Sequence, residues 1–208
     1  MIHKRTIPAL VFLLLATIAG AQINIYLGGN LQGNYSWMRE DGHTFKPGFG
    51  GGFSFVYWEY EYWFLKAGLE YHYMSSSALR YPEDFGVEPA DPQDKINIGF
   101  NEQTIGVPLA LYFRPYESGE NTLLIVGKLE TSFVIHLKES SDEYGDLVLK
   151  GTDVKTRVKT NLGLGAGYQR QLDRYMYLNI YPSFNMDLRG QQVFNSVTLT
   201  VELLYGVY

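Results

Sequence analysis

The chain contains no cysteine among its 208 residues. That absence excludes disulfides, thiolate metal sites, a cysteine nucleophile and the lipid-modified cysteine of a lipoprotein. Basic residues are also few, since 17 Lys and Arg stand against 22 Asp and Glu, and they are scattered along the chain. Because nucleic-acid binding requires a basic stripe or patch, the sequence argues against a nucleic-acid partner.

Long apolar runs are equally scarce, and the one at the N-terminus is short. Lys4 and Arg5 precede an apolar run over 7–18, and small residues follow over 19–21. This order is typical of a secretory signal peptide, and the run is shorter than the ~20 residues that span a bilayer as a helix. The sequence therefore predicts a signal peptide over 1–21 and one exported domain over 22–208.

The rest of the chain is rich in aromatic residues (15%) and in glycine, a composition that favours β structure. From Ile23 onward, apolar side chains recur at every second position, which is the period of a strand. Eight segments show this period: 23–31, 47–58, 62–73, 102–113, 122–138, 154–169, 175–188 and 196–207. None is suited to a transmembrane helix, so insertion into a membrane would require a closed barrel.

Within these segments the charged residues share the face opposite the apolar side chains. His136 and Lys138 are expected on this polar face as well. We expect its charges to pair as a structural network inside a barrel, because an unpaired buried charge is costly; a proton or ion relay is the alternative. The predicted network consists of Lys66, Glu70, Glu102, Lys128, Glu130, Lys155, Arg157, Lys159, Asp187 and Glu202.

Periodicity does not decide which face is outside, because a soluble barrel alternates in the same way. Two further features favour a membrane barrel: the segments are long, and the connections alternate in length. The predicted connections are 32–46, 59–61, 74–101, 114–121, 139–153, 170–174 and 189–195. The sequence thus predicts an all-β fold, an eight-stranded antiparallel up-and-down transmembrane β-barrel.

Aromatic residues gather where the predicted strands meet the short connections, which is the place of an interfacial girdle. This predicted girdle consists of Tyr57, Trp58, Tyr62, Trp63, Phe113, Tyr168, Tyr175 and Tyr205. The residues predicted to contact lipid near the strand centres are Leu65, Leu109, Ile125, Leu164, Ile180 and Val201. An eight-stranded barrel is just wide enough to be filled by its own side chains, so no open pore is expected.

Catalytic and metal-binding patterns are weak. His72 precedes three serines, Ser75 to Ser77, and Glu70 shares its face, an arrangement that would suit a lipid hydrolase. No serine lies two residues from His72 on that face, so the spacing does not support a triad. His43 and His136 are too far apart in sequence to indicate a metal site. We predict no catalytic, cofactor-binding or metal-binding residues.

Four short motifs stand out in the predicted strands: Lys46-Pro47-Gly48-Phe49-Gly50-Gly51-Gly52-Phe53, Leu65-Lys66-Ala67-Gly68-Leu69-Glu70-Tyr71, Ile105-Gly106-Val107-Pro108-Leu109 and Gly163-Leu164-Gly165-Ala166-Gly167-Tyr168. With these motifs the chain resembles the PorT-like outer-membrane barrels of Bacteroidota. The resemblance implies fold and location more than activity, although the founding member of that family is implicated in protein secretion and gliding. Barrels of this class usually end on a lipid-facing aromatic residue, whereas Tyr208 is in phase with Glu202, which indicates a bulge near Gly206 or a nonstandard insertion signal.

The leading hypothesis is a non-catalytic integral protein of the outer membrane that acts through its surface loops or through partner contacts. Its expected partners are outer-membrane lipid, the barrel-insertion machinery and an envelope protein engaged in assembly or secretion. Two alternatives stay open: a lipid-modifying hydrolase of the outer membrane, and a soluble periplasmic barrel that binds a small apolar ligand.

Overall fold

A computed structural model describes residues 24–38, 43–58, 62–85, 95–141, 144–147, 158–188 and 194–207. The predicted signal peptide, Lys155, Arg157 and Tyr208 lie outside these residues. Within these ranges no helix is long and apolar enough to cross a membrane. The elements are β1 (Asn24–Met38), β2 (Thr44–Trp58), β3 (Trp63–Arg80), the 3-10 helix η1 (Pro82–Phe85), β4 (Ile96–Ser118), β5 (Asn121–Ser141), β6 (Gly145–Leu147), β7 (Val158–Asp173), β8 (Met176–Asp187) and β9 (Phe194–Val207).

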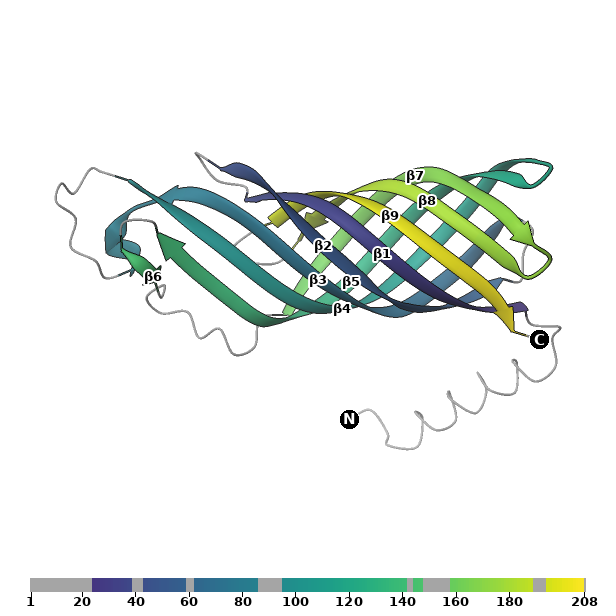
Figure 1. Ribbon diagram of the computed structural model, residues 1–208, viewed down its shortest axis with the longest axis horizontal. Helices are drawn as coiled ribbons and strands as arrows, with labels where there is room; N and C mark the ends of the chain where they lie inside the picture. Colours follow the sequence, from purple (N-terminus) through teal and green to yellow (C-terminus); the bar gives the residue numbers. More distant parts are fainter. Residues whose placement is uncertain are drawn as a thin grey trace, which may run out of the picture.

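The long strands form a closed barrel in which each pairs antiparallel with its neighbours (Figure 1). Pairing of β1 with β9 joins the first strand to the last. The three-residue β6 pairs only with the end of β5. The prediction of an eight-stranded up-and-down antiparallel barrel is therefore confirmed.

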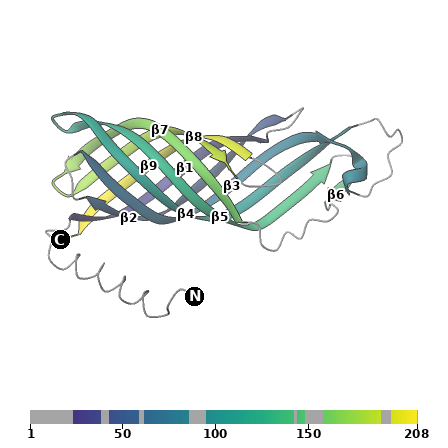
Figure 2. The same ribbon diagram turned by 180° about the vertical axis from the view of Figure 1, so that it is seen from behind.

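The two ends of the barrel differ. The short connections after β2, β4 and β7 lie at the end that also holds Val207, which we call the turn end; the opposite end is the loop end (Figures 1 and 2). At the loop end β3, β4 and β5 continue past the other strands, and β4 has 23 residues where β8 has 12. We call this extension, residues 78–80, 96–103 and 134–141, the projection.

Two of the predicted connections are shorter than expected, because strands extend into them: β1 and β2 occupy 32–38 and 44–46 of the predicted connection 32–46, and β3 and β4 occupy 74–80 and 96–101 of the predicted connection 74–101. In β4 the hydrogen-bonded pairing continues beyond the apolar alternation, where the outward residues, such as Asn97 and Asn101, are polar. Ser75, for example, pairs with Asn101 in register, and its hydroxyl donates a hydrogen bond to Asn101 Oδ1 at 2.8 Å.

A bulge in β5 overturns the prediction that His136 and Lys138 face the lumen. Gln103 pairs with His136 and Thr104 with Val134, so Ile135 is an extra residue. Beyond it the alternation reverses, and His136 and Lys138 are exposed instead of facing the lumen. The apolar residues Phe133, Ile135 and Leu137 keep the period of two through the bulge, so the sequence showed no change of phase there.

The barrel is apolar outside and polar inside. The six residues predicted to contact lipid, Leu65, Leu109, Ile125, Leu164, Ile180 and Val201, are 39–64% exposed on the outer surface. Lys66 is 3% exposed, Glu70 2% and Glu202 0% on the inner side of the same strands. This distribution is the reverse of a soluble barrel, whose apolar side chains fill the interior.

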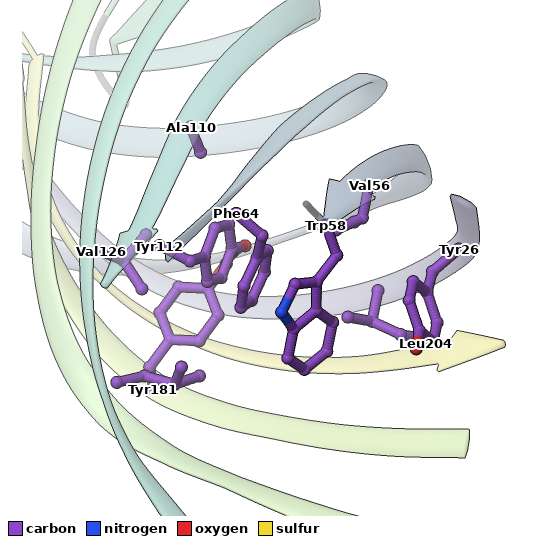
Figure 3. Packing of buried hydrophobic residues seen from close by; sticks show 10 residues of the cluster. Tyr26, Val56, Trp58, Phe64, Ala110, Tyr112, Val126, Tyr181 and Leu204 are labelled. Carbon is purple, nitrogen blue, oxygen red and sulfur yellow. Dashed lines mark hydrogen bonds between the residues drawn. The ribbon is translucent and has the colours of Figure 1, made fainter. Parts of the chain in front are cut away.

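An apolar layer fills the lumen near the turn end (Figure 3). Its rings stack on one another, with Phe64 and Tyr112 centroids 4.6 Å apart and Trp58 and Phe64 centroids 4.9 Å apart. We call the ten buried residues of this layer the turn-end layer: Tyr26, Val56, Trp58, Phe64, Ala110, Tyr112, Leu124, Val126, Tyr181 and Leu204.

The prediction that Trp58 belongs to the interfacial girdle is therefore wrong, because its side chain is 8% exposed and lies inside the barrel. It follows Tyr57 directly, and adjacent residues of a strand face opposite sides. The remaining predicted girdle residues lie near the turn end; among them Tyr62, Phe113, Tyr168 and Tyr205 are 41–58% exposed, whereas Tyr57, Trp63 and Tyr175 are half-buried.

Candidate functional site: a buried ionic network in the lumen

Charged side chains from β3, β5 and β9 meet in the lumen beside the turn-end layer. We call Lys66, Glu70, His72, Lys128, Glu130 and Glu202 the lumen network. Lys66 Nζ lies 2.7 Å from Glu202 Oε1 and 3.2 Å from Glu70 Oε1. Lys128 Nζ lies 3.0 Å from Glu130 Oε2 and 3.5 Å from Glu70 Oε2. Each ammonium group thus bridges two carboxylates.

Neutral donors complete the solvation of the carboxylates. Glu70 accepts hydrogen bonds from Asn30 Nδ2 at 3.1 Å and Gln32 Nε2 at 3.0 Å. Glu202 accepts from Asn179 Nδ2 at 3.0 Å and from the Tyr112 hydroxyl at 3.2 Å. Buried charges persist only when they are paired and hydrogen-bonded in this way.

His72 joins the network beside two of its carboxylates. Its Nε2 lies 3.2 Å from Glu130 Oε1 and 3.6 Å from Glu70 Oε2. Both Glu70 and His72 point inward because they are two residues apart on β3. The network holds three carboxylates and two ammonium groups, so it carries one excess negative charge while His72 is neutral.

Three glycines leave the space that these side chains occupy. A Cβ added at Gly50 would lie 2.9 Å from His72 Nδ1, and one added at Gly52 would lie 2.9 Å from Glu70 Cγ. A Cβ at Gly106 would lie 2.5 Å from Glu130 Oε1. At Gly50 and Gly52 the added atom would also clash with the backbone carbonyl oxygen of Tyr71 or Leu69, so no larger residue fits there, whereas at Gly106 it would push the Glu130 carboxylate aside.

A small cavity of about 30 Å³ adjoins His72, Lys128 and Glu130. Such a volume holds a single water molecule or ion. Polar side chains also line it, among them Asn34 and Asn185, and Met74 and Phe194 contribute apolar surface. Phe194 belongs to an apolar cluster at the loop end that includes Ile98, and Met74 packs against this cluster.

A second ionic cluster is formed by three further residues that the sequence predicted for the network. Lys159 Nζ lies 2.5 Å from Glu102 Oε2 and 3.5 Å from Asp187 Oδ2, and all three side chains are buried. The structure thus divides the predicted network into two groups, while Lys155 and Arg157 lie outside the described residues.

The serines after His72 make other contacts. Ser75 Oγ donates to Asn101, and Ser76 Oγ donates to the Thr44 carbonyl oxygen at 3.1 Å. Across the part of the chain that the structure describes, no serine hydroxyl is hydrogen-bonded to His72. Its polar neighbours are Glu70 and Glu130, a grouping that the sequence did not reveal because β4 separates β3 from β5.

Comparison with known proteins identifies the fold only. No family model and no curated protein matches the chain. Neisserial surface protein A has a similar structure, with a TM-score of 0.52 and 12% identity over 88% of this chain and 97% of that one. Ail of Yersinia pestis follows at 0.44 and 16% identity (88% and 98% covered), and the outer membrane protein OprG of Pseudomonas aeruginosa at 0.42 and 13% (90% and 97% covered). The PorT-like resemblance stays a prediction, and the chain shares the eight-stranded barrel fold of outer-membrane proteins.

Proposed function

We propose that the protein is a non-catalytic integral barrel of the outer membrane that acts as a contact surface through its projection. The observation that carries this proposal is the reversed polarity of the barrel. Leu109 and Leu164 are 59% and 64% exposed on the outer surface, while Glu202 is fully buried inside. Exposed apolar surface of this extent needs lipid to cover it.

The outward-facing apolar side chains form a belt around the barrel, which we call the apolar belt. Aromatic rings at both of its ends support its placement in a membrane. Phe113 and Tyr205 face outward near the turn end. Nearer the loop end, the rings of Phe49 and Tyr73 stack with their centroids 5.3 Å apart. The ring centroids of Trp37 and Phe45 lie 4.9 Å apart. Rings at two heights are the arrangement of interfacial girdles in membrane barrels.

The projection is the part suited to contacts outside the membrane. β7 begins opposite Phe133 and β2 begins opposite Ser77, so β4 and β5 rise above their neighbours. The outer side of the projection carries Asn97, His136 and Lys138, which are exposed. In this proposal a partner in the cell envelope binds here, and the PorT-like motifs suggest assembly or secretion as the process.

A filled lumen supports contact over transport as the role. Phe64 and Tyr112 in the turn-end layer are fully buried, and the salt-bridged lumen network adjoins that layer. An eight-stranded barrel filled in this way offers no aqueous channel.

Cysteine labelling tests the placement, because the wild-type chain has no cysteine. Single variants Ile125→Cys, Leu164→Cys and Val201→Cys should react with a lipid-confined thiol probe in intact outer membranes. Asn97→Cys should instead react with a membrane-impermeant reagent on whole cells, and Thr198→Cys, on the inner face, with neither. Recovery of the protein in the soluble periplasm, with position 125 protected from both reagents, would contradict the proposal and favour a soluble barrel.

Capture tests the contact role. Crosslinking in cells from Asn97→Cys should join an envelope protein to the barrel, and the same crosslinker at the turn-end position Glu117→Cys serves as the control. Equal crosslinking from both positions, or none from Asn97, would contradict a partner at the projection.

A further inference from the structure

We propose that Glu70, His72 and Glu130 form a binding site for one divalent transition-metal ion, of which Zn²⁺ is the type, inside the barrel. The three residues offer one imidazole nitrogen and two carboxylate oxygens, and these atoms lie within 4.8 Å of one another. Nitrogen and oxygen donors together favour Zn²⁺ and its first-row neighbours over Ca²⁺ and Mg²⁺, which prefer oxygen alone.

The distances already approach those of a metal centre. In a tetrahedral zinc site with bonds of about 2.0 Å, neighbouring ligand atoms are about 3.3 Å apart. His72 Nε2 lies 3.2 Å from Glu130 Oε1 and 3.6 Å from Glu70 Oε2. The ligand atoms of Glu70 and Glu130 lie within 4.8 Å of each other, so side-chain rotations would have to bring them closer to surround an ion.

Second-layer hydrogen bonds hold two of the ligands in place. Ser132 Oγ donates to Glu130 Oε1 at 2.6 Å, and Gln32 Nε2 donates to Glu70 Oε2 at 3.0 Å. Partners of this kind orient ligating carboxylates in metal sites. The glycines Gly50 and Gly106 keep the space for the imidazole and for Glu130 open.

The adjoining cavity supplies room for a fourth ligand. Its volume of about 30 Å³ accommodates one water molecule beside His72 and Glu130. Asn34 and Asn185, which line it, are 5% and 9% exposed, and among the described residues their Oδ1 atoms have no hydrogen-bond partner. Zinc sites with three protein ligands usually keep a water molecule in the fourth position.

Lys128 is the cation that a metal ion must displace. Its ammonium group lies 3.0 Å from Glu130 and 3.5 Å from Glu70, where it compensates the same charge that a metal would. Its side chain is 16% exposed, against 1–2% for these two carboxylates, and it also lines a cavity of about 10 Å³. The ammonium group is thus less enclosed than the carboxylates it pairs with, and in this proposal it competes with the metal ion for them.

Because Lys128 and the metal ion compete for the same carboxylates, substituting a ligand should weaken metal binding, whereas substituting Lys128 should strengthen it. In the purified full-length mature barrel, freed of metal with a chelator and held in detergent, calorimetric titration with Zn²⁺ should show one ion bound per chain. His72→Ala and Glu130→Gln should each weaken binding by at least about tenfold, which is the loss that even an outer partner's substitution causes. Lys128→Met should strengthen binding by about tenfold or more, since it removes the competing charge.

Matched controls come from the rest of the barrel. Glu102→Gln removes a buried carboxylate of the second ionic cluster, and His136→Ala removes an exposed imidazole; both should bind Zn²⁺ as the wild type does. Circular dichroism establishes that each variant is folded. Absence of binding in both the wild type and Lys128→Met, or binding unchanged by His72→Ala, would overturn the proposal.

A measurement on the wild type covers the case in which a ligand variant does not fold. The NMR signals of the imidazole rings report metal binding whether or not a side chain is accessible to reagents. Zn²⁺ should shift the ring signals of His72 and leave those of the exposed His136 unchanged. Unchanged His72 signals at saturating Zn²⁺ would count against the site.

Discussion

Two regions of the same lumen are filled by different chemistry. The turn-end layer consists of stacked rings such as Phe64 and Tyr112, whereas the lumen network beside it consists of paired charges such as Lys66 and Glu202. Apolar residues of similar volume can replace a buried ion pair with little loss of stability or with a gain. Filling the barrel therefore explains the turn-end layer but does not require the network, which is why the network is the candidate site.

The largest effect is expected from removing one cation of the network. Lys66→Met leaves Glu202 and Glu70 without the ammonium group that bridges them, and it should lower the free energy of unfolding by about 3–5 kcal/mol. Urea unfolding in lipid vesicles measures this. Lys138→Met is the matched control, because its pair with Asp146 is 49% and 74% exposed and such pairs contribute about 0–1 kcal/mol. Equal losses of unfolding free energy in Lys66→Met and Lys138→Met would show that the salt bridges of the lumen network contribute no more than an exposed ion pair.

The outer surface should respond to charge according to depth. Leu164→Arg places a cation on the apolar belt and should cost about 2–4 kcal/mol of unfolding free energy in a bilayer. Asn97→Arg on the projection should change it by less than about 0.5 kcal/mol, as surface substitutions do. Similar costs at both positions would contradict the position of the belt.

A smaller effect is expected where the two regions meet. Tyr112 belongs to the turn-end layer, yet its hydroxyl lies 2.9 Å from the Tyr181 hydroxyl and donates to Glu202 at 3.2 Å. Tyr112→Phe should lower the free energy of unfolding by about 1–3 kcal/mol, because a buried acceptor loses its donor. Tyr116→Phe, at a side chain 66% exposed, should leave the urea midpoint unchanged. An unchanged free energy of unfolding in Tyr112→Phe would show that the turn-end layer and the lumen network are not coupled.

The smallest effect on stability should accompany a clear effect on binding. The Cβ of Gly106→Ala would meet the flexible end of Glu130, which can move aside, so we expect a loss of roughly 1 kcal/mol. Displacing that carboxylate should weaken Zn²⁺ binding about tenfold. Gly127→Ala, which has nothing within 4 Å of its Cβ, should change neither quantity. Unaltered affinity in Gly106→Ala would argue against Glu130 as a ligand.

The alternating pattern was sufficient to predict the barrel and the face of each strand, because a period of two is a property of neighbouring residues. Leu65 and Lys66 illustrate this, since they lie outside and inside as the pattern indicates. The extension of β4 over 96–101 escaped prediction because its outward residues, such as Asn97, are polar. The bulge at Ile135 escaped because it depends on the pairing of two strands.

The candidate site was only half visible in the sequence for a related reason. Glu70 and His72 share one strand, so their common face could be predicted. Glu130 reaches them across β4, past the space that Gly106 leaves. Contacts across a lumen depend on how the barrel closes and on its register, and neither is encoded in the local pattern.

The reversed polarity of the barrel is tested most directly by quenching tryptophan fluorescence with brominated lipids. Trp58 and Trp63 lie near the turn end on opposite faces, the first 8% exposed inside the lumen and the second half-buried on the outer face. Variants that keep one tryptophan each are made by replacing the others with Phe, including Trp37, and are refolded into vesicles. Strong quenching of Trp63 and weak quenching of Trp58 are expected, whereas equal quenching or the reverse order would contradict a barrel with its polar face inside.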